Sequence, residues 1–204
     1  MSTHASDNHS PHIWPLIQSR PGPNLNIFGS RFDQRRNPRN GFELDGLVIE
    51  SRDWVNVVAL TDANEVVMIR QFRFGRGEVT IEIPGGAVDE GEEHGVAAQR
   101  ELLEETGFGG GRWSYLGASE PNPAFLDNLC HHWLAEGVEL RARELDLDPG
   151  EDIVVVTLGI EEIRKLAAAG RLRHSLVLLA LGWALVKLGR EPLPLPGDIS
   201  PGRG

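Results

Sequence analysis

The chain has 204 residues, enough for one enzyme-sized domain, and its 40% hydrophobic and 25% charged residues are typical of a globular protein. A formal net charge of -10 argues against general binding to nucleic acids or anionic membranes, because both require clustered Lys and Arg side chains. The single cysteine, Cys130, excludes an intrachain disulfide and favours a reducing compartment, the cytoplasm.

Residues 1–40 are rich in Pro, Asn, Arg and Ser, which predicts a flexible or irregular N-terminal arm. From residue 41 onward, β-branched and aromatic runs alternate with short turn segments, which predicts successive strands. These runs read FELDGLVIES, WVNVVAL, EVVMIRQF and EVTIEI. We therefore expect the folded domain to cover residues 41–190.

The segment GVAAQRELLEET predicts an amphipathic helix, with Val96, Leu102 and Leu103 on one side and a stop at Gly107. Further strands are expected at RWSYLGAS, LCHHWLAEGVEL and IVVVTLGI, and helices at EEIRKLAAAG and HSLVLLALGWALVKLG. The apolar stretch of the last helix is too short to span a bilayer and predicts a buried helix. Residues 191–204 are predicted to form a tail rich in Pro and Gly.

Acidic residues gather in the first predicted helix and just before it. Seven acids and one arginine lie between residues 86 and 108, and Glu101, Glu104 and Glu105 fall on one narrow helical face. Most such runs are simply solvated helix faces. A cluster of oxygen ligands also suits Mg²⁺ or Mn²⁺, which would offset the repulsion between the carboxylates.

The acids belong to a longer pattern that begins at a turn. Gly85 and Gly86 follow Pro84, and their missing side chains allow a ligand or metal to approach the backbone. The residues at fixed spacing are Gly86, Glu92, Arg100, Glu101, Leu102, Glu104, Glu105, Gly107 and Phe108. This segment resembles the motif of the Nudix hydrolases and satisfies every constrained position of it.

The resemblance implies an α+β fold, an α/β/α sandwich in which a mixed β-sheet core is flanked by helices, with an N-terminal β-rich extension. It also implies cleavage of a pyrophosphate bond by water with Mg²⁺ or Mn²⁺. The implied catalytic residues are Glu101, Glu104, Glu105 and Arg100, the last of which orients a glutamate. The implied metal ligands are Glu92, Glu101, Glu104, Glu105 and the carbonyl of Gly85.

Residues outside the motif resemble those of the ADP-ribose and nucleoside-diphosphate-sugar pyrophosphatases, from about Trp54 to Trp183. The resemblance makes Arg70 and Arg73 candidates for contacts to phosphate or sugar, and Glu82 a candidate to touch substrate or support the loop. Surface arginines beside a strand are an equally good explanation of the first two.

Pro123 lies fifteen residues past the motif, where a proline marks the ADP-ribose subgroup. Here Asn122 and Ala124 flank it in place of Ser and Gly, and Asp127 and Asn128 stand where an Asp-Glu pair is frequent. Pro123 also suits a rigid turn. The departure leaves nucleotide sugars other than ADP-ribose open.

The general base is expected in the stretch LDLDPGEDIVVV, where Glu151 and Asp152 are candidates and a helix glutamate is the alternative. Trp54 and Phe28 are candidates for stacking on the base of the substrate, or for structural packing. Of His131 and His132, one must face inward for packing or hydrogen bonding.

The subgroup is typically dimeric, so the resemblance implies a homodimer in which residues 25–60, and strands within 41–60 in particular, contribute to the interface. Two other functions stay open. One is a housecleaning pyrophosphatase acting on nucleoside triphosphates or dinucleoside polyphosphates. The other is a non-catalytic module that senses a nucleotide sugar.

Overall fold

The computed structural model describes residues 12–147 and 149–197, and these fall into two units. The first unit contains the described residues up to Ser51 together with Asn122–Asp127. The second contains Arg52–Pro121 and the described residues from Asn128 onward. The outer parts of the expected arm and tail, residues 1–11 and 198–204, lie outside the described residues.

The first unit is built on a three-stranded antiparallel sheet. Its strands, in spatial order, are β1 Leu16–Pro21, β2 Gly29–Arg36 and β3 Glu43–Glu50. Two of them lie in the range for which we expected an irregular arm. The N-terminal β-rich extension is confirmed, and the division of the chain into arm, domain and tail stays a prediction.

One ion-pair network holds the segment Asn122–Asp127 to this sheet. The guanidinium of Arg31 on β2 lies 2.8 Å from Glu50 and 2.9 Å from Asp127. The main-chain N–H of Ile49 donates to the carbonyl of Phe125 at 2.7 Å. A loop distant in sequence is thereby fixed to the end of β3.

The second unit contains a seven-stranded mixed sheet. Its strands are β4 Trp54–Thr61, β5 Glu65–Arg73, β6 Glu78–Glu82, β7 Phe108–Gly109, β8 Arg112–Ser119, β9 Cys130–Leu140 and β10 Ile153–Gly159. The order is β10-β5-β4-β9-β7, with β6 paired to β5 and β8 paired to β9. β4 and β9 run parallel and the other pairs antiparallel, so the sheet is mixed as expected.

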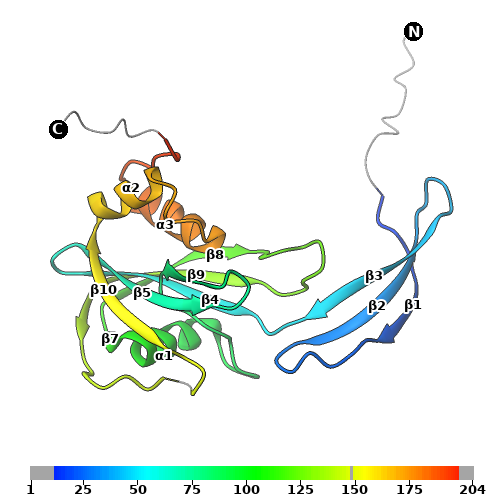
Figure 1. Cartoon of the computed structure of the whole chain (residues 1–204), viewed down its shortest axis with the longest axis horizontal. Helices are drawn as coiled ribbons and strands as arrows, with labels where there is room; N and C mark the ends of the chain where they lie inside the picture. The colour runs from blue at the N-terminus through cyan, green and yellow to red at the C-terminus, as the bar shows by residue number, and fades with distance from the viewer. Residues whose placement is uncertain (1–11, 148, 198–204) are drawn as a thin grey trace, which may run out of the picture. The chain divides into compact units, whose positions relative to one another are not determined.

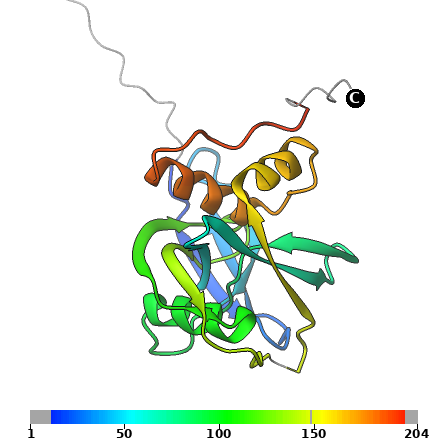
Figure 2. The ribbon, with the colours of Figure 1, turned by 90° about the vertical axis from the view of Figure 1, so that its left-hand side faces the viewer.

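Helices cover both faces of this sheet (Figures 1 and 2). α1, His94–Thr106, lies on one face, and α2, Ile160–Ala168, and α3, Ser175–Lys187, lie on the other. The α/β/α sandwich is therefore confirmed. Among the described helices, none has the length and hydropathy needed to cross a membrane.

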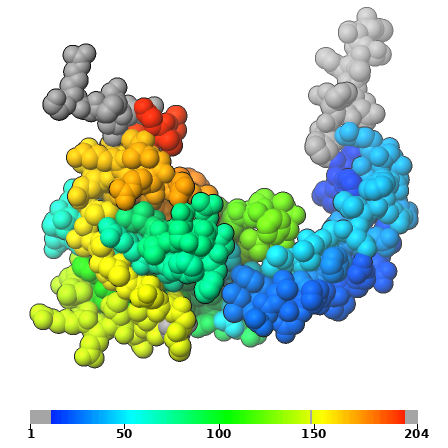
Figure 3. Space-filling model, viewed as in Figure 1, coloured from blue at the N-terminus to red at the C-terminus, as the bar shows by residue number. Residues whose placement is uncertain are grey.

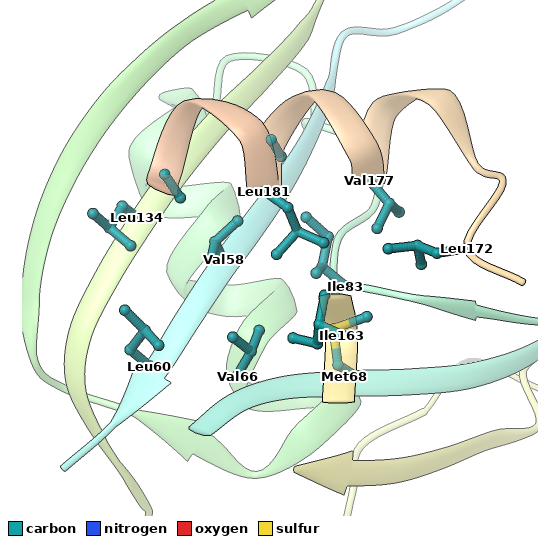
Figure 4. Packing of buried hydrophobic residues seen from close by; sticks show 12 residues of the cluster. Val58, Leu60, Val66, Met68, Ile83, Leu134, Ile163, Leu172, Val177 and Leu181 are labelled. Atoms are coloured by element: carbon teal, nitrogen blue, oxygen red, sulfur yellow. The ribbon is translucent and has the colours of Figure 1, made fainter. Parts of the chain in front are cut away.

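The alternation of side chains along β4 divides the core in two. Val58 and Leu60 pack with Leu181 of α3 in a cluster that also contains residues of β5 and α2 (Figure 4). Val57 packs against α1 in a second cluster, together with Val55 and Ala59, which lie on the same face of β4. Burial on both sides explains why the run WVNVVAL is mostly apolar, and its polar residue, Asn56, is hydrogen-bonded to His132.

The apolar face of α1 differs from our expectation. Val96 is 56% exposed and Leu103 is 41% exposed, whereas Ala97, Ala98 and Leu102 are fully buried. Small side chains face the sheet because the helix packs close to it. The helix ends at Gly107 as predicted, with a positive φ of 74° and its N–H donated to the carbonyl of Leu103.

His132 is the inward-facing histidine of β9. It is fully buried, and its ring nitrogens lie 2.7 Å from Asn56 Oδ1 and 2.8 Å from Ser119 Oγ. The ring of Trp183 meets it edge to face. Burial, with a smaller contribution from His131, lowers the pKa of His132 to about 4. Its role is hydrogen bonding in the core, as expected.

This histidine should make the fold sensitive to acid. Its pKa is about 6.5 in an unfolded chain and about 4 in the folded one, so protonation favours unfolding. The associated stability is present above pH 6.5 and is lost as the pH falls towards 4. Between pH 7 and pH 5 the free energy of unfolding should drop by about 2 kcal/mol from this group alone.

Denaturant unfolding of the wild type and of His132→Gln at both pH values measures this drop. Glutamine keeps hydrogen-bonding groups but does not titrate, so the variant reports the contribution of all other groups. The same pH dependence in both proteins would contradict the prediction.

Candidate active site

The Glu105 side chain is the deepest acid of α1. The residue is 2% exposed, and its Oε2 accepts a hydrogen bond from the main-chain N–H of Gly85 at 2.8 Å. Burial, with smaller contributions from the charges of Glu101 and Glu151, raises the pKa of Glu105 to about 8, against the opposing effects of the Gly85 N–H and Arg73. Acidic runs usually form a solvated helix face, but Glu105 is buried and does not belong to such a face.

Glu101 lies against the second glycine of the turn. Its side chain is 12% exposed, and a Cβ atom built on Gly86 would lie 2.5 Å from its carboxyl carbon. A Cβ atom on Gly85 would lie 2.2 Å from the carbonyl oxygen of Val55. Burial is the main cause of a raised pKa of Glu101. Both glycines are therefore required by the close approach of other parts of the chain, whereas the approach of a ligand or metal stays a prediction.

Arg100 contacts three of the motif acids at once. Its guanidinium donates to both oxygens of Glu92 at 3.1 and 2.9 Å, to Glu101 Oε1 at 2.8 Å and to Glu104 Oε2 at 3.0 Å. It also donates to the carbonyl of Ala87 at 3.1 Å. One oxygen each of Glu101 and Glu104 is left outside these contacts.

The main chain of the turn directs one more oxygen toward the acids. The carbonyls of Pro84 and Gly86 accept hydrogen bonds from Val57 and Val55 of β4. In extended backbone the groups of the intervening residue point the opposite way. The carbonyl of Gly85 therefore shares the side of its own N–H, which is the side of Glu105.

The donor set fits a hard divalent cation. It consists only of oxygens, and two of its carboxyl groups are buried near each other, so a cation would offset the cost of ionising them. No three acidic, His or Cys side chains in the described ranges form a ready-made metal cage. Arg100 accounts for this, because it engages Glu92, Glu101 and Glu104 itself.

A second buried acid lies on β6. Glu82 is 3% exposed and receives two hydrogen bonds from Arg73, at 2.9 and 2.8 Å. Thr80 Oγ donates to it at 2.5 Å, and His174 Nε2 lies 3.8 Å away. These partners outweigh burial and lower the pKa of Glu82. The arrangement holds Arg73 rigidly at the end of β5.

Glu151 is brought within electrostatic range of the acidic helix. Its charge raises the pKa of Glu101, Glu105 and Arg73. Asp152 follows it and is exposed, whereas Asp148, from the same stretch, lies outside the described residues. The role of Glu151 as the general base stays a prediction.

The remaining candidates are divided between the two units. Arg70 is exposed on β5, and Trp54 is half-buried at the start of β4. Pro123 and Phe28 belong to the first unit. Their contribution to a substrate site stays a prediction.

Sequence reasoning missed two features of this site. It assigned no role to Thr80, whose hydroxyl supports Glu82, although the alternation Thr80-Ile81-Glu82 places both polar side chains on one face. It also treated Glu92 as a metal ligand only, whereas Glu92 caps the preceding turn by accepting the N–H of Asp89 at 3.1 Å.

Known proteins resemble this chain in sequence and in structure. It is 31% identical over 133 residues to the ADP-ribose pyrophosphatase of Bacillus subtilis, covering 65% of this chain and 72% of that protein. It is 29% identical over 153 residues to the ADP-ribose pyrophosphatase of Mycobacterium tuberculosis, covering 74% and 73%. It is 31% identical over 127 residues to the methanol dehydrogenase activator of Bacillus methanolicus, covering 62% and 69%.

A solved structure described as an ADP compounds hydrolase shares the fold, with a TM-score of 0.78 and 20% sequence identity over 89% of this chain and 99% of that one. Residues 51–178 match the family model of the NUDIX domain. This range is more than half of the chain and contains the acids, glycines and arginine described above. The chain therefore belongs to the Nudix family of hydrolases.

Proposed function

We propose that this protein hydrolyses the pyrophosphate bond of ADP-ribose or another nucleoside-diphosphate sugar, giving a nucleoside monophosphate and a sugar phosphate. The observation that carries the proposal is the contact of the buried Glu105 with the Gly85 N–H, beside Glu101 and Gly86, in a complete motif. Two relatives that are named ADP-ribose pyrophosphatases support the choice of substrate.

The proposed cofactor is Mg²⁺ or Mn²⁺. Glu92, Glu101, Glu104, Glu105 and the carbonyl of Gly85 are the proposed ligands. Bound there, the cation would neutralise charge on the pyrophosphate oxygens and promote ionisation of the attacking water. This positive charge is needed because a chain of net charge -10 must accept an anionic substrate.

The reaction adds a water oxygen to one phosphorus and breaks the bond from that phosphorus to the bridging oxygen, which keeps the electron pair. Glu151 is proposed to accept the proton from water, because its charge already acts on Glu101 and Glu105. Asp152 or a glutamate of α1 is the alternative base. Arg100 is proposed to orient Glu101 and Glu104 through the hydrogen bonds described.

Substrate recognition is proposed to involve Arg70, Arg73, Glu82, Pro123 and Trp54. Arg73 is suited to bind phosphate or sugar because Glu82 holds its guanidinium in a fixed plane. Ala124 and Asn128, which depart from the pattern of the ADP-ribose subgroup, are the reason to keep other nucleotide sugars open. We also propose that the protein acts in the cytoplasm.

A panel of nucleotide sugars at fixed Mg²⁺, with products separated by chromatography, tests substrate and bond together. ADP-ribose should yield AMP and ribose 5-phosphate. Glu104→Gln and Glu105→Gln should each lower kcat/KM by about 100-fold or more, because several kcal/mol of charge stabilisation are lost. Glu90→Gln, which removes an exposed acid of the same region, is the matched control and should keep wild-type activity.

Other outcomes of the panel have distinct meanings. Release of inorganic pyrophosphate or orthophosphate from nucleoside triphosphates would favour the housecleaning alternative. Tight binding of ADP-ribose without any product would favour the sensing module. Normal activity in both glutamine variants would overturn the proposed chemistry.

The two glycines of the turn should respond differently to alanine. Gly86→Ala pushes on the end of the Glu101 side chain, so activity should fall by at least about tenfold with little change in Tm. Gly85→Ala meets the backbone of Val55, so the Tm should fall clearly. Gly182→Ala, where a Cβ meets nothing within 4 Å, is the control. A drop in activity that always follows the drop in Tm would contradict the distinction.

We further propose a homodimer in which β3, within the predicted interface region 25–60, takes part. Exposed apolar residues of the first unit support this, among them Leu16, Phe42, Leu44 and Leu47. Light scattering coupled to gel filtration should give twice the chain mass of 22.4 kDa. Leu44→Glu should shift the mass toward that of one chain, and a mass of one chain for the wild type would contradict the proposal.

A further inference from the structure

A cavity of about 1410 Å³ lies in the second unit, between the hairpin of β5 and β6 and the segment that joins α2 to α3. The hairpin and α2 meet at the same surface in the space-filling view (Figure 3). None of the acids of α1 lines this cavity. Arg70 and Arg73, which are also proposed to contact substrate, line it, so the cavity adjoins the candidate active site without including its acids.

The wall of the cavity is strongly basic. Its cationic residues are Arg70, Arg73, Arg76, Lys165, Arg171 and Arg173, against the acids Glu78 and Glu162. This excess of positive charge occurs in a chain whose formal net charge is -10. Cations concentrated in one hollow repel one another, so an anion bound there would be stabilised.

Only some of these cations have an acidic partner. Arg73 pairs with Glu82, and Arg76 and Arg173 share Glu78 at 3.2 and 2.7 Å. In the part of the chain that the structure describes, no carboxylate forms an ion pair with Arg70, Lys165 or Arg171. Their donors are exposed and available to a ligand.

The rest of the wall offers both hydroxyl groups and apolar surface to the uncharged part of an anion. Thr80 and Ser175 contribute hydroxyl groups, and Ile81 and Leu166 contribute apolar surface. The N-terminus of α3 also reaches the wall, and no side chain caps its first turn. Its free N–H groups add to the positive potential that the side chains create.

We infer that this cavity is a second binding site, for a small phosphate-bearing anion with two or more negative charges. Arginine and lysine side chains supply the positive charge, so binding needs no divalent cation. The acidic remainder of the chain favours a small anion over a nucleic acid. The inference goes beyond the proposed function and does not rest on it.

Titration calorimetry with inorganic pyrophosphate, on the full chain in EDTA, tests this site. The double variant Lys165→Gln/Arg171→Gln should bind about tenfold more weakly than the wild type, since two charge-assisted contacts are removed. The control is Arg143→Gln/Lys187→Gln, which changes the net charge equally at exposed positions outside the cavity. It should bind within about twofold of the wild type.

Two further measurements separate this site from the acidic one. Glu104→Gln should leave metal-free pyrophosphate binding unchanged. The KM for ADP-ribose should be the same in the Lys165→Gln/Arg171→Gln variant and the wild type, because neither of these residues is a proposed substrate contact.

Four results would overturn the inference. These are absence of pyrophosphate binding in EDTA, an equal loss in both double variants, a loss in Glu104→Gln, and a rise of KM in the cavity variant. If the protein hydrolysed no nucleotide sugar, the calorimetry would still decide the question.

Discussion

The hydrogen bond from the Gly85 N–H to the carboxyl group of Glu105 joins the helix of the motif to the turn that precedes it. Burying a carboxyl group costs several kcal/mol unless it is hydrogen-bonded, so this contact must be kept for α1 to stay where it is. The turn itself is bound to β4, because the carbonyls of Pro84 and Gly86 accept hydrogen bonds from the N–H groups of Val57 and Val55. Helix, turn and central strand thus form one rigid assembly.

This assembly holds α1 close to the sheet, and the short distance determines which side chains its inner face can carry. The side of the helix that faces the sheet carries Ala97 and Ala98, and a Cβ atom on Gly95 would lie 3.0 Å from the ring of Trp133. Larger side chains would hold the helix away from the turn. Val96 and Leu103 therefore remain outside, on the exposed side of a helix whose buried side contains an acid.

The strands and helices of the second unit, apart from the two-residue strand β7, could be predicted from the sequence, because runs such as WVNVVAL are long and mostly apolar. The positions of the motif were also predictable, since spacing alone specifies them. The burial of Glu105 could not be, because helical periodicity treats every acid as polar and has no knowledge of the Gly85 N–H. Strands β1 and β2 were missed since most of their residues are polar and the segment between them is rich in Pro and Asn.

The basic cavity illustrates a different limit of sequence reasoning. Arg70 lies on β5, Lys165 on α2 and Arg171 in the segment after α2, so no local pattern connects them. Only the fold, which stacks α2 and α3 above the hairpin of β5 and β6, brings their charges together. The same fold places negative charge on α1, on the opposite face of the sheet (Figure 2). Acidic and basic side chains thus gather in two regions of one domain, and Arg73 of the basic wall is within electrostatic range of Glu105.

The ion pairs of Arg100 affect how this site forms. Its guanidinium is a counter-ion to Glu92, Glu101 and Glu104, so the repulsion among these acids is partly offset within the folded chain itself. The helix can then form and pack without a divalent ion. Under the proposed function, the ion would enter a site that is already folded, and its loss would stop hydrolysis without unfolding the chain.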